Sequence, residues 1–386
     1  MVTMGSGSER LVLPMGDDMH THLRQGELMD NVVPHLRKGG CNRVLVMPNT
    51  VPPIVTCSQA LEYRNELLRR DPNVDYLMTL YLCREVDPED LFNHAKASHV
   101  VGVKLYPRGV TTNSEAGVED LEGFDGVFEV LQRCGLTLHI HAESPNAPAL
   151  KAEEGFLPVF EQIHRRFPDM KIVFEHISTA AAVEAVRGKR NVAATITAHH
   201  LRLTTSDVFD PEHLHNDSST SVEERRVLNP HNFCKPIAKC EADRQALLGV
   251  SDLSLPISHP VADKSANTRL SRSWVILEGN PQFFLGSDSA PHPVSAKCSS
   301  VEQRQTRECK YLADTFARAG CLDKLRGFVS ELVEGEECVV LERAPFKVPK
   351  VVCGVEGSGS EVVPFLSGCE LLFTAKVVPY SPALDI

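Results

Sequence analysis

The feature that most constrains the fold of this chain is a repeated alternation of short apolar segments with segments of helical periodicity. The apolar segments are β-rich and almost continuously hydrophobic, which is typical of parallel strands covered on both faces. Eight of them favour an α/β fold in the form of a closed (β/α)8 TIM barrel over an open doubly wound sheet. No glycine-rich nucleotide-binding motif accompanies them. The predicted strands are residues 11–15, 43–47, 76–81, 100–105, 136–141, 171–176, 192–197 and 282–288.

The predicted helices lie between these strands, and a smaller unit follows the last one. Residues 1–300 are expected to form the barrel, with an insertion at about 249–273 that is polar and rich in serine. Residues 301–386 are expected to add a C-terminal helix (303–319) and appended segments packed on the barrel, including 339–343, 363–365 and 371–378. The predicted barrel helices are 28–38, 57–70, one that begins at 87–88, 124–134, 158–167, 179–187 and 241–248.

Composition and charge exclude some classes of partner. The 386 residues carry a formal net charge of −11 without a basic run, so nucleic acid is not an expected partner. No apolar segment approaches the roughly 18 residues that cross a membrane, and the N-terminus lacks a secretion signal. None of the 12 cysteines stands in a C-x-x-C pair. We therefore expect a soluble cytoplasmic protein with reduced thiols, most of them buried.

Polar side chains gather at the carboxyl ends of the predicted strands. In a barrel these ends meet at one face, where active sites are built. Each residue alone is a weak signal, because a single H-x-H pair or a lone histidine is more often structural. Four histidines and an aspartate at strand ends together predict a metal site. His139, two residues before the last His of its strand, is predicted to be an interior histidine. The candidate ligands are His20, His22, His141, His176 and Asp288, with Lys104 beside them.

Lys104 stands in an apolar strand with its head group directed toward this cluster. An ammonium beside two dications is strongly repelled, and a buried lysine readily loses its proton. The neutral amine reacts with carbon dioxide to give a carbamate, whose two oxygens can bridge two metal ions. The alternative is a lysine that extends out of the barrel mouth to solvent.

Six sequence segments together resemble the dihydroorotase family of the amidohydrolase superfamily, in its shorter monofunctional type from bacteria and fungi. The combination is specific, whereas other cyclic amidases share only the H-x-H, the lysine and the aspartate. The NPHNFCKP segment is similar to the fungal form in particular. The segments are HTHLR (20–24), VMPN (46–49), KLYP (104–107) followed by TTNS (111–114), FEH (174–176), NPHNFCKP (229–236) and GSDSAPH (286–292).

The resemblance implies a function and a role for each site residue. The reaction would be the reversible, zinc-dependent cyclisation of N-carbamoyl-L-aspartate to (S)-dihydroorotate, the third step of de novo pyrimidine biosynthesis, in a homodimer. Two zinc ions would be bridged by N6-carboxylysine at Lys104. One ion would be held by His20, His22 and Asp288, and the other by His141 and His176. Asp288 would also transfer the proton. The substrate would be bound by Arg24, Asn49 and His292, with Thr111 and Thr112 on a loop that closes over it.

Two alternatives remain open at this point. The chain is a different cyclic amidase, such as a dihydropyrimidinase-like enzyme, if Arg24 does not bind a substrate carboxylate. It is a catalytically impaired dihydroorotase-like chain if its C-terminal departures matter. Besides the insertion at 249–273, the Ala-Gly-aromatic segment that the family carries after His292 is missing. A later Asn-Gly-x-x-Phe-Tyr-Gly-Leu segment is also missing between residues 327 and 339.

Overall fold

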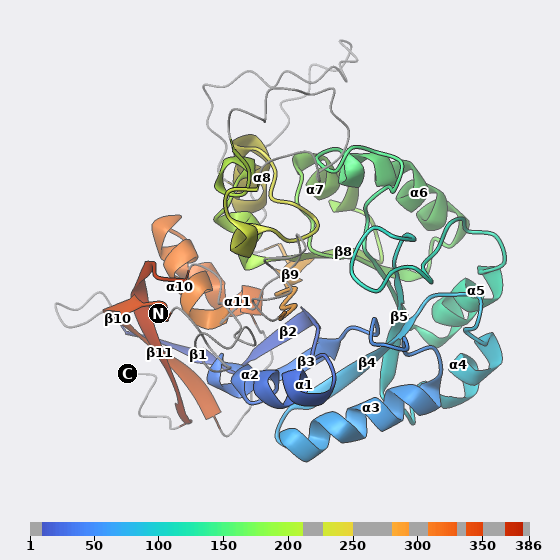
Figure 1. Cartoon of the computed structure of the whole chain (residues 1–386), viewed down its shortest axis with the longest axis horizontal. Helices are drawn as coiled ribbons and strands as arrows, with labels where there is room; N and C mark the ends of the chain where they lie inside the picture. The colour runs from blue at the N-terminus through green and yellow to red at the C-terminus, as the bar shows by residue number, and fades with distance from the viewer. Residues whose placement is uncertain are drawn as a thin grey trace, which may run out of the picture.

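A computed structural model describes residues 10–210, 227–249, 280–292, 308–329, 337–349 and 367–380. Within this part, eight parallel strands form a barrel, as the sequence predicts (Figure 1). The chain after the last strand returns to the first strand at its end, where Thr21 and Ser289 form a parallel bridge. In spatial order the strands are β2 (Gly16–Thr21), β3 (Cys41–Val46), β4 (Asp75–Tyr81), β5 (Val100–Leu105), β6 (Thr137–Ile140), β7 (Lys171–Phe174), β8 (Val192–Ile196) and β9 (Phe283–Leu285).

Helices surround the strands and cover their outer faces (Figure 1). Phe174 of β7, for example, packs its ring 5.3 Å from that of Phe160 on α6. Local sequence fixes several helix ends: Thr56 caps α3 in a capping box, and Gly135 ends α5 in a left-handed conformation. The helices are α1 (Gly26–Val32), α2 (His35–Lys38), α3 (Cys57–Arg70), α4 (Pro88–His94), α5 (Asp125–Cys134), α6 (Ala152–Arg166), α7 (Ala180–Val186) and α8 (Glu241–Leu248).

The prediction that residues 11–15 form the first barrel strand is wrong. These residues fall in β1 (Arg10–Pro14) and just beyond it, and β1 belongs to a separate antiparallel sheet. The barrel begins with β2, whose sequence GDDMHT does not have the apolar character expected of a buried strand. Its charges are satisfied individually. Asp18 accepts hydrogen bonds from the backbone nitrogen and hydroxyl of Ser287, and Asp17 pairs with Arg43.

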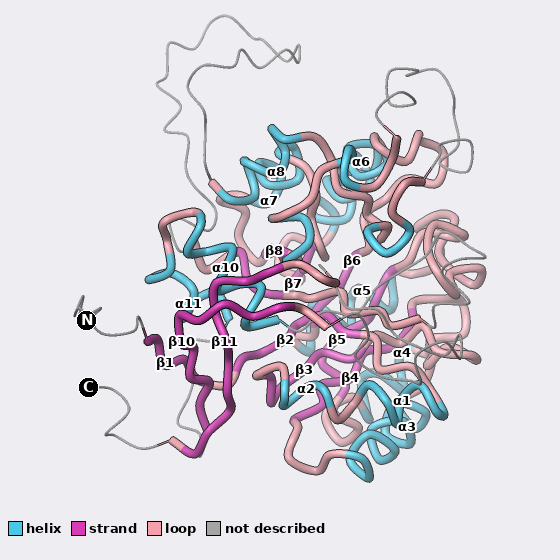
Figure 2. Tube along the Cα trace, turned by 60° about the vertical axis from the view of Figure 1, so that its left-hand side comes forward, coloured by secondary structure: helices cyan, strands magenta, loops and turns pink. Residues whose placement is uncertain are grey.

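The small sheet has the order β1–β10–β11, with β10 at Glu337–Lys347 and β11 at Glu370–Pro379. It lies beside the barrel with α10 (Glu308–Arg318) and α11 (Leu325–Val329), as Figure 2 shows. The buried carboxylate of Asp314 on α10 ties these parts together. It accepts hydrogen bonds from the backbone nitrogen of Leu372 and from Arg318, and it pairs with Arg202.

Two predicted helices have different bounds in the structure, and some predicted segments lie outside the described residues. The predicted helix 28–38 is divided at Val33–Pro34, and α6 begins before the predicted residue 158 and passes through Pro158. Most of the insertion at 249–273, the segment after His292 and residues 363–365 lie outside the described residues. Among the described cysteines, six are buried, three are exposed and none is in a disulfide. No described helix is long and apolar enough to span a membrane.

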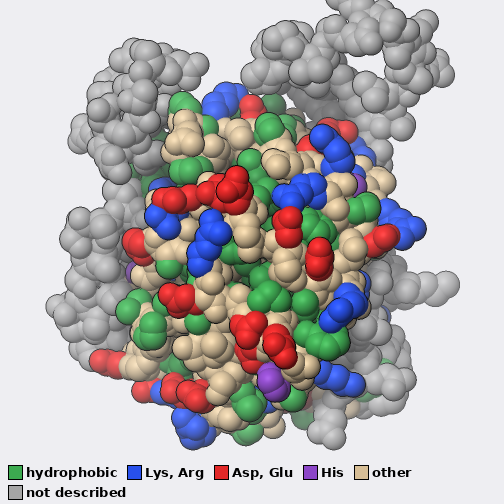
Figure 3. All heavy atoms as spheres, turned by 90° about the vertical axis from the view of Figure 1, so that its right-hand side faces the viewer, with side chains coloured by type: hydrophobic (Ala, Val, Ile, Leu, Met, Phe, Trp, Pro, Cys, Tyr) green, Lys and Arg blue, Asp and Glu red, His purple; other side chains and the backbone are tan. Residues whose placement is uncertain are grey.

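The surface of the barrel helices mixes charges of both signs. On the face shown in Figure 3, acidic and basic side chains alternate and form no continuous basic field.

Gly102 of β5 tests how tightly the barrel interior is packed. An added Cβ would lie 2.3 Å from the carbonyl oxygen of Thr137 and 2.8 Å from Cδ2 of His139. We therefore expect Gly102→Ala to lower the free energy of unfolding by about 1–3 kcal/mol in a urea titration. The control is Gly126→Ala in α5, where the added Cβ would lie 3.4 Å from Cγ of Pro88, an ordinary van der Waals contact. Equal stability of the two variants would contradict the expectation.

Candidate metal centre and substrate site

His20 and His22 converge with Asp288 at the mouth of the barrel. The Nδ1–H of His20 donates to Glu175 (2.9 Å), and the Nδ1–H of His22 donates to the Asn49 side-chain oxygen (2.7 Å). Both rings therefore present Nε2, and these atoms lie 3.4 Å and 3.3 Å from Oδ1 of Asp288. The three residues place one ligand atom each within 4.8 Å of one another, a spacing that suits a metal ion.

The other predicted ligands lie beside this group of three residues. The ring of His176 lies 4.9 Å from that of His20 and 4.7 Å from that of His141. His141 donates from Nε2 to Glu143 (2.8 Å), so Nδ1 is its nitrogen left for a metal. The amine of Lys104 is fully buried and has no hydrogen-bond partner among the described residues; it lies 5.3 Å from the Tyr106 ring centroid.

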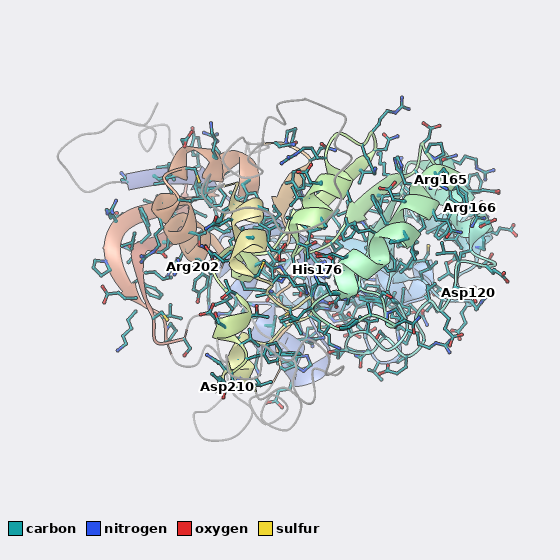
Figure 4. All side chains as sticks on the ribbon, turned by 90° about the horizontal axis from the view of Figure 1, so that it is seen from above. Asp120, Arg165, Arg166, His176, Arg202 and Asp210 are labelled. Carbon is teal, nitrogen blue, oxygen red and sulfur yellow. The ribbon has the colours of Figure 1, made fainter. Side chains whose placement is uncertain are left out.

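His176 reaches the site through an unusual backbone conformation. Phe174 points outward to α6, so strand alternation places Glu175 inside the barrel and would place His176 outside again. A positive φ of 41° at His176 ends this alternation and turns its ring inward. The backbone nitrogen of His176 donates to the Thr195 hydroxyl (2.6 Å). Figure 4 shows His176 near the centre of the molecule, whereas Arg165 and Arg166 lie at its outer edge. Left-handed non-glycine residues are strained, and they cluster at functional sites.

Burial lowers the pKa of three candidate histidines, and at Asp288 it is opposed by the neighbouring rings. It lowers the pKa of His22 to about 4, and it also lowers the pKa values of His141 and His176. These rings are therefore neutral near pH 7, the form that binds metals. Burial alone would raise the pKa of Asp288. The interactions with His20, whose own pKa is raised, and with His22 outweigh this effect and hold that pKa well below its usual range, so Asp288 is a carboxylate.

The Lys104 amine responds to the same burial. Burial lowers its pKa to about 8, even though the carboxylates of Glu175 and Asp288 act in the opposite direction. The neutral amine is therefore much more abundant near pH 8 than for a lysine in water. This is the form that can react with carbon dioxide.

The substrate-binding candidates lie at the rim of the same cluster. Arg24 donates from Nε to the carbonyl of Pro291 (3.0 Å) and from Nη2 to Nε2 of His292 (2.8 Å). Asn49, besides accepting from His22, donates to the backbone carbonyl of Thr112 (3.0 Å). Thr111 is the neighbour of Thr112 on this loop and bonds through its backbone to Ser114 (Thr111 N to Ser114 Oγ, 3.0 Å). The structure thus brings together all the residues that the sequence analysis selected.

Glu175 and Glu143 are site residues that the sequence analysis did not select. Glu175 accepts from Nδ1 of His20, from Nδ1 of His139 (2.7 Å) and from the Thr195 hydroxyl (2.6 Å). His139 is interior, as predicted, although its Nε2 has no partner among the described residues. The available signal was the position of each glutamate: an acidic residue at or just past the end of an apolar strand, within two residues of a candidate ligand.

Comparison with known proteins identifies the family. A probable dihydroorotase of Schizosaccharomyces pombe is 38% identical over 372 residues, which cover 92% of this chain and 96% of that protein. The chain belongs to the dihydroorotase family. The dihydroorotase of Saccharomyces cerevisiae is 33% identical over 399 residues, covering 94% of this chain and 97% of that protein. Family membership makes the chain a cyclic amide hydrolase. A scan against models of protein families gave no match.

Solved structures agree with the assignment to the dihydroorotase family. The crystal structure of S. cerevisiae dihydroorotase in complex with 5-fluoroorotic acid has a TM-score of 0.79 and 31% identity, covering 96% of this chain and all of that one. The dihydroorotase of Campylobacter jejuni has a TM-score of 0.78 and 28% identity, covering 97% of this chain and 99% of that one. L-Hydantoinase (dihydropyrimidinase) from Arthrobacter aurescens, at 15% identity and a TM-score of 0.65, shares the fold alone; the match covers 96% of this chain and 84% of that one.

Glu175 orients the candidate ligand His20 by accepting a hydrogen bond from its Nδ1. We expect Glu175→Gln to lower zinc affinity about 10- to 100-fold, because an amide cannot accept from both imidazoles and the hydroxyl. A competitive chelator titration of the purified protein measures this affinity. Glu161→Gln is the matched control, since Glu161 pairs with Lys189 on the surface (3.0 Å). Unchanged zinc affinity in the Glu175 variant would contradict a role in orienting His20.

Proposed function

We propose that this chain catalyses the reversible cyclisation of N-carbamoyl-L-aspartate to (S)-dihydroorotate with two zinc ions, as the third step of de novo pyrimidine biosynthesis. The observation that carries the proposal is the convergence of His20, His22 and Asp288 to metal-ligand spacing. Membership of the dihydroorotase family supplies the reaction. The neighbouring side chains of His141, His176 and Lys104 would supply ligands for a second ion.

The residues present fit a dinuclear centre. His20, His22 and Asp288 would hold one ion, His141 and His176 the other, and carboxylated Lys104 would bridge them. A buried amine without a hydrogen-bond partner fits this role, because a carbamate replaces it with two metal-binding oxygens. The free nitrogens of the histidines also fit, since their other nitrogens are already bound by Glu175, Asn49 and Glu143. When bound, such ions lower the pKa of a water between them and polarise the carbonyl that is attacked.

Asp288 is the proposed proton carrier. It enters the reaction as a carboxylate, and Oδ1 is the oxygen that faces His20 and His22. In the hydrolytic direction it takes the proton of the attacking water and delivers it to the leaving ring nitrogen. In the cyclising direction Asp288 accepts the proton of the attacking amide nitrogen as the C–N bond forms, and it delivers this proton to the hydroxyl group that leaves the carboxyl carbon as water. Its other oxygen, Oδ2, accepts a hydrogen bond from the Cys234 thiol (3.2 Å).

Arg24, Asn49 and His292 are the proposed binding residues for the substrate carboxylate. The guanidinium matches a carboxylate in shape and charge, and its contact with His292 places the two side chains together. Thr111 and Thr112 stand on the loop that Asn49 holds over the mouth. A loop in this position excludes water and strengthens the electrostatic contacts beneath it.

Two further features are proposals that rest on family resemblance alone. We propose that the protein is a homodimer and that it acts in the cytoplasm on its small-molecule substrate. Light scattering of the purified chain and fractionation of the source cells measure these two properties.

Activity assays separate the proposed function from its alternatives. With zinc and bicarbonate present, we expect turnover of dihydroorotate and of N-carbamoyl-L-aspartate, and none of dihydrouracil, which lacks the carboxylate. Arg24→Met should lower kcat/KM for dihydroorotate on the order of 100-fold, as expected for a lost charge-assisted pair. Equal activity of Arg24→Met would favour a dihydropyrimidinase-like amidase. An inactive wild type with its zinc bound would favour the catalytically impaired chain.

Carboxylation of Lys104 can be observed without an activity assay. Protein loaded with zinc in ¹³C-bicarbonate should show a carbamate carbon signal by NMR, because burial keeps part of this amine neutral. Lys104→Met should lack the signal and bind fewer zinc ions than the wild type. Lys151→Met, which changes an exposed lysine paired with Glu154, should retain both. A carbamate signal that persists in Lys104→Met would place the modification on a different lysine.

A further inference from the structure

Two adjacent residues, Cys234 and Lys235, contact two different parts of the proposed active site. The Cys234 thiol donates to Oδ2 of Asp288 (3.2 Å). The Lys235 ammonium donates to the backbone carbonyl of Val110 (2.8 Å). Val110 directly precedes Thr111 and Thr112, so one short segment touches both the proton carrier and the loop above it.

The loop in question, here called the mouth loop, comprises residues 107–118. Its stem is closed by a bridge between Pro107 and Val118. Within it, the Ser114 hydroxyl donates to the Thr111 carbonyl (2.5 Å), and Gly109 donates to the Ser114 carbonyl (3.0 Å). These bonds shape the tip of the loop. They do not attach it to the barrel.

Attachment comes from two sides. On one side, Asn49 donates to the Thr112 carbonyl (3.0 Å), and Asn113 donates to the Asn49 carbonyl (2.9 Å). Asn49 is itself bound to His22. On the other side, the bond from Lys235 holds Val110. The tip of the loop is thus held between Asn49, which contacts His22, and Lys235, whose neighbour Cys234 contacts Asp288.

The chemistry of the Lys235 contact suits a reversible anchor. Val110 is 8% exposed, so its carbonyl is largely shielded from water and needs a donor. A bond from an ammonium to a carbonyl is stronger than one between neutral groups, yet a single such bond shifts a local equilibrium only about 10- to 100-fold. It can therefore hold the loop in place and still release it once per turnover.

We propose that Lys235 is a positioning residue that holds the mouth loop closed over the metal centre. The loop is then held from two sides, by Asn49 and by Lys235, and Lys235 acts on substrate binding only through Val110. The proposal rests on the proposed function for its effect on turnover. The closed position of the loop itself does not depend on which reaction is catalysed.

The test uses zinc-loaded, full-length protein and two substitutions. Lys235→Met removes the donor and keeps the length of the chain, whereas Lys235→Arg keeps a charged donor. Lys151→Met is the matched control on the surface. Trypsin reports loop opening directly, because Arg108 is exposed and its peptide bond to Gly109 lies in the mouth loop. Lys235 itself precedes Pro236 and is not cleaved, so substituting it removes no cleavage site.

We expect cleavage after Arg108 to be about 10-fold faster in Lys235→Met than in the wild type, with zinc content unchanged and Lys235→Arg close to the wild type. KM for dihydroorotate should rise about 10-fold in Lys235→Met, with a smaller change in kcat. An unchanged cleavage rate overturns the proposal, as does faster cleavage at all tryptic sites alike, which reports general instability. Faster local cleavage in a chain without turnover would support the anchor and refute the proposed function.

Discussion

The structure depends on the contact between the first and last strands of the barrel, because this contact closes the sheet and brings the candidate metal ligands together at the same place. The backbone nitrogen of Asp288 donates to the carbonyl of His20, and that of His22 donates to the carbonyl of Ser289. Ser287 is held by Asp18 through two hydrogen bonds. The ligand atoms are therefore spaced by the same bonds that join the strands. A metal that binds here also reinforces the closure of the barrel.

Sequence alone could locate most of this site, because strand ends carry a physical rule. His141 ends an apolar β-rich segment, Lys104 lies one residue before the end of one, and the topology of a barrel brings such ends together. The rule failed where a residue departs from its pattern. The polar residues of β2 are tolerated in the barrel because Asp18 binds Ser287, which is far away in the sequence, and Asp17 pairs with Arg43 on the next strand. Local hydrophobicity carries no information about such partners.

The inward direction of the His176 side chain also could not be predicted from the alternation of side chains along a strand. Glu175 and His176 both face the site, which a regular strand does not permit, and only the positive φ at His176 allows it. Glu175 was not selected, because the sequence analysis looked for ligands at the last residue of each strand and Glu175 directly precedes that residue. The contacts of Asn49 with Thr112 and of Lys235 with Val110 join segments far apart in the chain. No local pattern carries such pairings, so they became visible only in the structure.

Burial links the proposed carbamate to the metal ions. The interior holds the carboxylates of Glu175 and Asp288, and the Lys104 ammonium now supplies a compensating positive charge beside them. Conversion of that amine to a carbamate would replace a cation by an anion and place three negative groups in a space shielded from water. Such a cluster is costly unless cations enter with it. A carbamate at this position therefore requires metal ions, and two closely spaced ions require the carbamate to offset their repulsion. Carboxylation and metal loading should thus proceed as one coupled event.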